Sequence, residues 1–149
     1  MAEIKWAESA HHLPIEAFSP NPKNPKKHTK KQLEHIRNSI LHFGFLDPIG
    51  VWGKEHVVVE GHGRLEALKQ LVQDGKIRIP AEGVPCIMLD HLSKRDRDAY
   101  MLEHNQSTME TPWDDDLLDD VLGDIADEGL DMEQFGFELP GEEGGEDGK

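Results

Sequence analysis

The chain has 149 residues, of which 30 are acidic and 16 are basic, so its formal net charge at pH 7 is −14. At this length we expect one domain with an appendage. The sequence contains no apolar run of about 20 residues, as a membrane span requires, no apolar segment behind a basic N-terminus, and a single cysteine, Cys86. These features argue against a membrane span, a secretory signal, an internal disulfide and a multi-cysteine zinc site, and they predict a cytoplasmic protein.

The charge is divided unevenly along the chain. Residues 1–110 carry 15 acidic and 15 basic side chains, whereas residues 111–149 carry 15 acidic side chains and one basic side chain. We therefore predict a neutral domain over 1–110, an acidic helical extension over 111–139 and a disordered tail over 140–149, which has no large apolar residue. The acidic part is expected to be either a solvated, solubilising surface or a docking segment for a basic partner.

The first predicted elements surround a proline-rich loop. A short strand is expected near 12–15, and the three closely spaced prolines that follow prevent a helix or a central strand over 19–28. Thr29 is a suitable N-cap for an amphipathic helix, and Gly44 supplies its end.

The middle of the chain predicts a hairpin and then a junction between a strand and a helix. The β-rich runs 49–53 and 56–60 form the hairpin. Directly after them, Gly61-His62-Gly63-Arg64 opens a helical run that Gly75 closes. The later elements expected are a strand over 84–89, a helix from Arg97 to His104 preceded by a Ser93–Asp96 capping box, and a final helix from Pro112 to about Ala126. The apolar residues that follow are expected to fold back on the neutral domain; they are Leu130, Met132, Phe135 and Phe137.

The junction Gly61–Arg64 has the clearest chemistry. A glycine-containing turn from a strand into a helix directs backbone N–H groups and the positive end of the helix dipole toward one point. Arg64 can hold a phosphate through paired N–H groups, and His62 can donate a hydrogen bond or move a proton. These residue types favour a phosphate pocket. An ordinary tight turn with a solvated Arg64 would use the same glycines and stays an alternative.

Other surfaces are weaker candidates. The segment Phe43–Ile49 can present its backbone to a planar ligand or simply link a helix to a strand. The histidines lack metal-ligand spacing, and Cys86 lies in an apolar strand. A cluster of lysines can contact a nucleic-acid backbone, form a solvated face or pair with the acidic helix; its members are Lys23, Lys26, Lys27, Lys30 and Lys31.

The order of these motifs resembles the ParB/sulfiredoxin-like N-terminal domain, also described as a ParB-like nuclease domain. It is most similar to the phage and plasmid type that is often joined to DNA-modification methyltransferases. The resemblance covers about 12–137 and implies an α+β fold: a small mixed β-sheet with packed helices, plus the acidic C-terminal helix. It rests on Asn21-Pro-Lys-Asn-Pro, Ser39–Ile49, Val59–Ala67 and Val84-Pro-Cys-Ile.

The resemblance also implies a site for a nucleoside triphosphate with Mg²⁺. In the family, the turn holds the triphosphate, the segment after the first helix lies by the base and ribose, and a later helix carries a Glu-Asn pair near the magnesium. The matching residues are Gly44, Phe45, Leu46, Asp47, Pro48, Glu60, Gly61, His62, Gly63, Arg64 and Asn105; His62 and Arg64 are the catalytic candidates and Asn105 is the metal candidate.

The sequence departs from the family pattern at this site. Partition ParB proteins have Glu-Arg-Arg where this chain has His62-Gly63-Arg64, and His104 replaces the acid of the Glu-Asn pair. His62 also stands where sulfiredoxin has its catalytic cysteine, so that reductase activity is not expected.

The expected function is a CTP- or ATP-binding module of a mobile element or prophage, with or without hydrolysis. It would act in DNA organisation or modification, on DNA directly or through a methyltransferase partner. A ParB-like DNA nuclease and a non-catalytic interaction module with an acidic docking helix are the alternatives, and the oligomeric state stays open.

Overall fold

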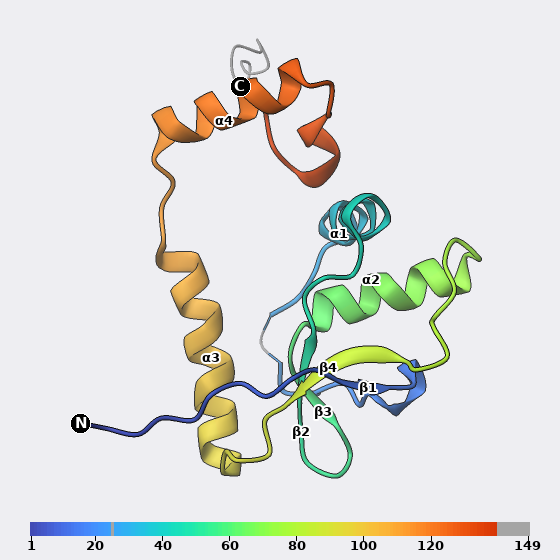
Figure 1. Cartoon of the computed structure of the whole chain (residues 1–149), viewed down its shortest axis with the longest axis vertical. Coiled ribbons are helices and arrows are strands. Elements are labelled where there is room, and N and C mark those ends of the chain that lie inside the picture. The colour runs from blue at the N-terminus through green and yellow to red at the C-terminus, as the bar shows by residue number, and fades with distance from the viewer. Residues whose placement is uncertain (25, 140–149) are drawn as a thin grey trace. The chain divides into compact units, whose positions relative to one another are not determined.

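The computed structural model describes residues 1–24 and 26–139, and the chain divides into two compact units, Met1–Gln106 and Ser107–Lys149. The first unit contains a four-stranded mixed sheet with helices, so the expected α+β class is confirmed (Figure 1). Its elements are β1 (His11–Leu13), η1 (Ile15–Ala17), α1 (Lys30–Phe43), β2 (Ile49–Trp52), β3 (Val57–Glu60), α2 (His62–Gln73), β4 (Val84–Met88) and α3 (Lys94–Glu110), whose last turn enters the second unit.

The sheet has the strand order β1-β4-β2-β3. The hairpin strands β2 and β3 are antiparallel, with an irregularity in register between Gly50 and Val51. Strand β4 pairs parallel to β2 and antiparallel to β1. The parallel pair needs a long crossover, which α2 provides between β3 and β4.

Alternation along the strands separates two apolar clusters. On one side of the sheet, Ile49, Val51 and Val58 are fully buried together with Leu65 and Leu68 of α2. The other cluster joins Val59 to α3 and to the turn that precedes it, through Met101 and Leu89. The neighbouring residues Val58 and Val59 of β3 therefore belong to different clusters, which fixes the position of Glu60 and of the turn that follows it.

Local capping sets the ends of α1 as the sequence predicts. The Thr29 hydroxyl accepts a hydrogen bond from the Gln32 N–H at 3.0 Å. At the other end, Gly44 has φ 107°, and its N–H donates to the Ile40 carbonyl at 2.9 Å. Before α3 the Ser93 hydroxyl accepts a hydrogen bond from Asp96 N–H, as the predicted capping box requires. The helix itself is longer than predicted at both ends, because it begins at Lys94 rather than Arg97 and continues beyond residue 104.

The second unit consists of α4 (Asp115–Asp127) followed by the 3₁₀ turn η2 (Met132–Phe135), in addition to the end of α3. The predicted start of this helix at Pro112 is wrong, because the Asp114 carboxylate accepts from Leu117 N–H and caps the helix there. The chain folds back after α4, since Leu122 is buried and Phe137 contacts the Trp113 ring. The predicted disordered tail lies outside the described residues.

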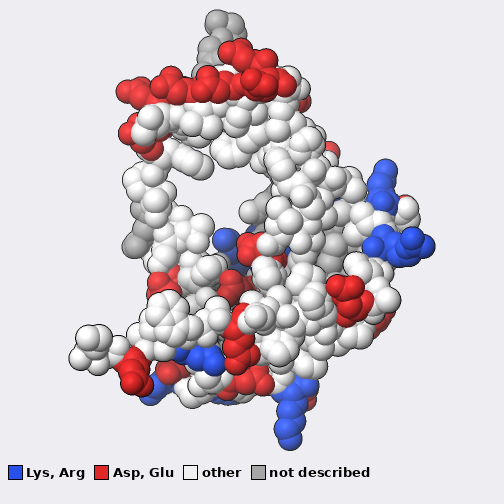
Figure 2. Space-filling model, in the orientation of Figure 1, with Lys and Arg blue, Asp and Glu red and all other residues white. Residues whose placement is uncertain are grey.

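Acidic side chains cover one side of α4, as the red atoms over that helix show in Figure 2. Six aspartates belong to its thirteen residues, and its last turn has no basic side chain. Within the part of the chain that the structure describes, no helix is long and apolar enough for a membrane span.

We expect Gly83→Ala to destabilise the fold much more than Gly53→Ala, because only Gly83 has neighbouring backbone in the way. Both glycines have positive φ, at 108° and 85°. A Cβ at Gly83 would lie 2.5 Å from the Leu13 carbonyl oxygen in β1, whereas one at Gly53 would meet nothing within 4 Å.

The backbone conformation alone should cost each variant about 1–2 kcal/mol of unfolding free energy, and Gly83→Ala should lose more because β1 must shift. Urea unfolding followed by circular dichroism measures both values. Equal losses would show that the contact between Gly83 and Leu13 is not a constraint.

Candidate functional site

A left-handed residue makes the turn between β3 and α2. Gly61 has φ 99° and ψ 18°, which an L-residue with a side chain adopts only at a cost. A Cβ there would also lie 2.8 Å from Ile49 Cδ1 and 2.9 Å from Arg64 Nη2. Glycine is therefore required at this position both by the backbone conformation and by the close approach of two side chains.

The Arg64 side chain joins the turn to the segment that follows α1. Its Nε donates to the Asp47 carbonyl at 3.1 Å, and its Nη2 donates to the Pro48 carbonyl at 3.0 Å. Its Nη1 lies 3.4 Å from the Asp47 carboxylate. The guanidinium is thus engaged by the protein, although it has further N–H groups that a ligand can use.

Glu60, the last residue of β3, is held by α3. Its carboxylate accepts a hydrogen bond from the Tyr100 hydroxyl at 3.0 Å and lies 3.4 Å from His104 Nε2. A Cβ at Gly50 would lie 2.6 Å from Glu60 Cγ, so the side chain occupies space that only glycine leaves open. Burial, followed by the negative charge of Glu60, raises the pKa of Tyr100 to about 12.

His62 and Gly63 face a different side of α2 from Arg64. The imidazole of His28 lies over Gly63 and close to His62, and burial followed by the charge of His28 lowers the pKa of His62. The structure therefore does not gather His62 and Arg64 around one point. Residues two apart on a helix project in nearly opposite directions, which accounts for the separation.

The remaining predicted nucleotide residues are spread around this turn. Gly44 and Phe45 line an apolar cavity of about 310 Å³, whereas Leu46 is 79% exposed. Asn105 is half-buried on α3, one residue beyond His104. Across residues 1–24 and 26–139, no group of three or more His, Cys, Asp or Glu side chains is arranged to hold a metal ion.

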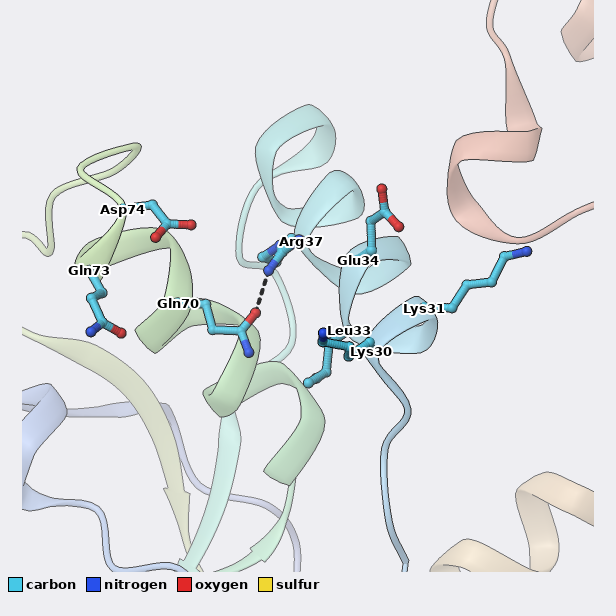
Figure 3. A pocket seen from close by; sticks show the side chains of 8 residues that line it. All are labelled: Lys30, Lys31, Leu33, Glu34, Arg37, Gln70, Gln73 and Asp74. Carbon is cyan, nitrogen blue, oxygen red and sulfur yellow. Dashed lines mark hydrogen bonds between the residues drawn. The ribbon is translucent and has the colours of Figure 1, made fainter.

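The basic cluster lies on the surface of the loop before α1 and the first turn of α1. All five lysines are exposed, and Lys30 and Lys31 also line a groove of about 600 Å³ between α1 and α2 (Figure 3). Arg37 and Gln70 form a hydrogen bond across this groove, while Glu34 and Asp74 add negative charge to its lining.

Sequence reasoning missed the contact roles of His28 and Tyr100. Each side chain contacts a residue that is distant in the sequence: the His28 ring lies against Gly63, and the Tyr100 hydroxyl donates to Glu60. No local pattern in the sequence links these residues. The rings of Tyr100 and His104 lie with their centroids 5.8 Å apart. The one signal of this contact in the sequence is their spacing of four residues on a helix.

The fold is a small mixed sheet in which a glycine-containing turn leads from β3 into α2. Arg64 connects this turn to the segment after α1, and this arrangement can be compared with known protein families. Residues 2–105 match the ParB N-terminal domain family. The chain belongs to this family.

Two relatives are similar in sequence. Over 62 residues the chain is 37% identical to the probable chromosome-partitioning protein ParB of Campylobacter jejuni, which covers 40% of this chain and 22% of that protein. Over 80 residues it is 30% identical to the ParB-like nuclease domain-containing protein YnaK of Escherichia coli, which covers 54% of this chain and 82% of that protein.

Solved structures share the fold. The C-terminally truncated chromosome-partitioning protein ParB from Caulobacter crescentus, complexed with CTP-gamma-S, has a TM-score of 0.60 at 22% identity and covers 86% of this chain and 65% of that one. A Pnob8-like ParB-N domain has a TM-score of 0.50 at 16% identity, covering 80% and 45% of the two chains. The chain thus spans less than a quarter of the Campylobacter protein and about two thirds of the Caulobacter structure.

We expect Arg64→Gln to lower the unfolding free energy by about 2 kcal/mol, since a charged hydrogen bond contributes roughly 1.5–3 kcal/mol and Arg64 is partly exposed. Arg95→Gln is the matched control, because the Arg95 side chain is 87% exposed and forms its ion pair with the neighbouring residue Asp96. Urea unfolding of both variants makes the comparison. Equal stabilities would mean that Arg64 does not fasten the two segments.

We expect Tyr100 to titrate well above the usual tyrosine range of about 10. Because the raised pKa favours the neutral phenol in the folded state, its stabilising contribution is present below about pH 10 and is lost as the pH rises through about 12.

Tyr100 is the one tyrosine of the chain, so the ultraviolet absorbance of tyrosinate reports it alone. Glu60→Gln should move the titration partway back, since burial remains. Titration of the parent chain at the usual pH would contradict the contact.

Proposed function

We propose that the chain is a nucleoside triphosphate-binding module, with CTP or ATP and Mg²⁺ as its ligand, that acts in DNA organisation. The proposal rests on the two hydrogen bonds and the ion pair through which Arg64 connects the glycine turn to the segment 44–48. Membership of the ParB N-terminal domain family and the CTP-gamma-S complex of the Caulobacter relative support it.

The proposed ligand lies along both fastened segments. Its base and ribose contact the exposed segment 44–48, and its phosphates lie at the turn Gly61–Arg64. The N-terminal end of α2 has no side-chain cap from Gly61, so its first N–H groups are suited to donate hydrogen bonds to phosphate oxygens. Arg64 adds positive charge at the same place while it holds Asp47 and Pro48 in position.

The residues of α3 fit a supporting role for Mg²⁺. This ion usually keeps several waters and uses one or two protein oxygens together with substrate phosphates, so a dense acidic cluster is not required. Asn105 would supply one oxygen. Glu60 is bonded to Tyr100 and close to His104, which places its carboxylate near the start of the turn. If the nucleotide is hydrolysed, His62 would move a proton and Arg64 would stabilise the phosphate charge.

The proposed DNA contact is the basic cluster before and within the first turn of α1. Lysines at the surface neutralise phosphates without reading sequence. A DNA methyltransferase partner and a mobile-element or prophage setting complete the proposal. The alternative of an interaction module is favoured by α4, where Leu117 and Val121 are exposed beside the aspartates.

We expect the full-length chain to bind CTP or ATP with Mg²⁺ saturably, with Arg64→Ala weakening binding at least about tenfold, the equivalent of about 1.4 kcal/mol. Isothermal titration with CTP, ATP and GTP measures this, with Arg95→Ala as the control. Absence of binding by the parent chain to all these nucleotides would overturn the proposal, and equal binding by both variants would remove Arg64 from the site.

The same preparation tests the nuclease alternative, for which the name of the E. coli relative is the support. Supercoiled plasmid is incubated with the protein and Mg²⁺ or Mn²⁺. We expect the plasmid to stay intact and to bind the protein at low salt. Replacement of the five lysines by glutamine should abolish this binding. Metal-dependent nicking would instead establish the nuclease.

A further inference from the structure

The second unit carries a surface that the proposed nucleotide site does not use. The match to the ParB N-terminal domain family ends at residue 105, whereas this unit begins at Ser107. Its described part, 107–139, contains 12 acidic side chains and no Lys, Arg or His. Within 107–139, no side chain can therefore offset the negative charge of α4.

Helix α4 has an apolar side and an acidic side. Leu118, Leu122 and Ile125 recur at four- and three-residue intervals and are buried or half-buried, and α4 packs against η2 of the same unit. The aspartates lie on the other side, and in Figure 2 the acidic atoms follow one side of the helix while uncharged atoms follow the other. The unit therefore covers one side of α4 and leaves the acidic side in solvent.

An exposed apolar edge lies between these two sides. Leu117 and Val121 are one turn apart and are 61% and 53% exposed. Trp113 continues the four-residue interval directly before the helix cap; it is 65% exposed, and its ring meets the Phe137 ring edge-on, with centroids 6.0 Å apart. Large apolar side chains that are exposed together, one of them an aromatic anchor, are typical of an interaction surface.

Aspartates border this edge. Asp120 follows Leu117 by three residues and Asp124 follows Val121 by three residues, so each carboxylate lies on the neighbouring strip of the helix surface. Both aspartates are exposed. The negative end of the helix dipole favours a cation near Asp124, but the last turn of α4 has no basic side chain. The edge thus combines apolar anchors with negative charge that its own unit does not offset.

We propose that this edge is a docking surface for a cationic amphipathic helix of a partner protein. The apolar residues of the partner pack on Leu117 and Val121, with Trp113 as the aromatic anchor, and its Lys or Arg side chains pair with Asp120 and Asp124. Paired helices select their partners in this way, through apolar residues along the seam and charges beside it. The proposal goes beyond nucleotide binding and uses residues of the second unit alone.

Charge disfavours a second copy of this chain as the occupant. In a two-fold symmetric contact the same patch meets itself, so Asp120 and Asp124 of one copy would border the same carboxylates of the other. Like charges across an interface act against a partner. A cationic helix keeps the apolar contact and replaces this repulsion with attraction.

The test measures binding of the full chain to a labelled peptide by fluorescence anisotropy. The peptide has about 18 residues, enough for a helix to form on docking, and consists of Leu, Lys and Ala, with leucines every three or four residues and lysines beside them. We expect saturable binding. A peptide of the same composition with its leucines scattered around the helix should bind at least about tenfold more weakly.

Two sets of variants locate the surface. Leu117→Gln combined with Val121→Gln should weaken binding at least about tenfold, whereas Leu41→Gln, which changes a 50% exposed leucine of α1, should have no effect. Glutamine keeps a helix propensity close to that of leucine. Asp124→Asn should also weaken binding, and more than Asp119→Asn does, because Asp119 is two residues from both leucine and valine and projects away from them.

Several results would overturn the proposal. Absence of binding by the amphipathic peptide would do so, and equal binding of the two peptides would show a general attraction of charges without a docking surface. Unchanged binding by the variant at Leu117 and Val121 would place the contact elsewhere. Sedimentation of the parent chain without peptide completes the test, since self-association that this variant abolishes would make a second copy the occupant.

A substitution on another part of α4 separates docking from helix stability. Gly123 lies within the helix, and a Cβ there would meet nothing within 4 Å. Gly123→Ala should raise the helix content measured by circular dichroism, because alanine is a better helix former than glycine. Added to the variant at Leu117 and Val121, it should leave the affinity low. Recovery of affinity would show that helix content alone governs binding, which would also overturn the proposal.

Discussion

The arrangement of the candidate site depends on the hydrogen bonds from the Arg64 guanidinium to the carbonyls of Asp47 and Pro48. Those carbonyls follow α1, whereas Arg64 belongs to the first turn of α2, so one planar group sets the spacing between the two segments. The planar fork is suited to this task because several donors are fixed in one plane. The same side chain that we assign to the phosphates therefore first builds the surface on which the nucleotide would lie.

This position for Arg64 depends in turn on the path of the backbone at Gly61. The left-handed conformation lets β3 end and α2 begin within one residue, so Glu60 stays with the sheet while Arg64 already belongs to the helix. On the sheet side, Glu60 is bonded to Tyr100 of α3. The short turn is thus held from two directions, by a carboxylate before it and by a guanidinium after it.

Features that depend on a few neighbouring residues were predictable from the sequence. The capping of α1 by Thr29 and its end at Gly44 follow from local backbone chemistry, and so does the start of α2 after Gly61. The start of α4 was misplaced because Pro112 and Asp114 both suit a helix N-terminus, and the carboxylate that bonds Leu117 N–H decides between them.

Contacts between distant residues were not predictable in the same way. Nothing near Gly63 in the sequence indicates that its missing side chain makes room for His28, and nothing near Arg64 indicates that backbone carbonyls occupy its fork. The prediction of a single phosphate pocket treated four consecutive residues as one unit. The helix instead sends His62 and Arg64 to different sides, which gives the turn two distinct neighbourhoods.

The aspartates of α4 have a consequence for the helix itself. Asp115 and Asp116 suit the positive end of its dipole, but Asp124 and Asp127 lie near the negative end, and pairs such as Asp120 and Asp124 stack like charges one turn apart. Each unfavourable pair is weak and is screened by dissolved ions. The stability of this helix therefore depends on ionic strength. A polyamine or a cationic protein surface would stabilise it as salt does, but at far lower concentration.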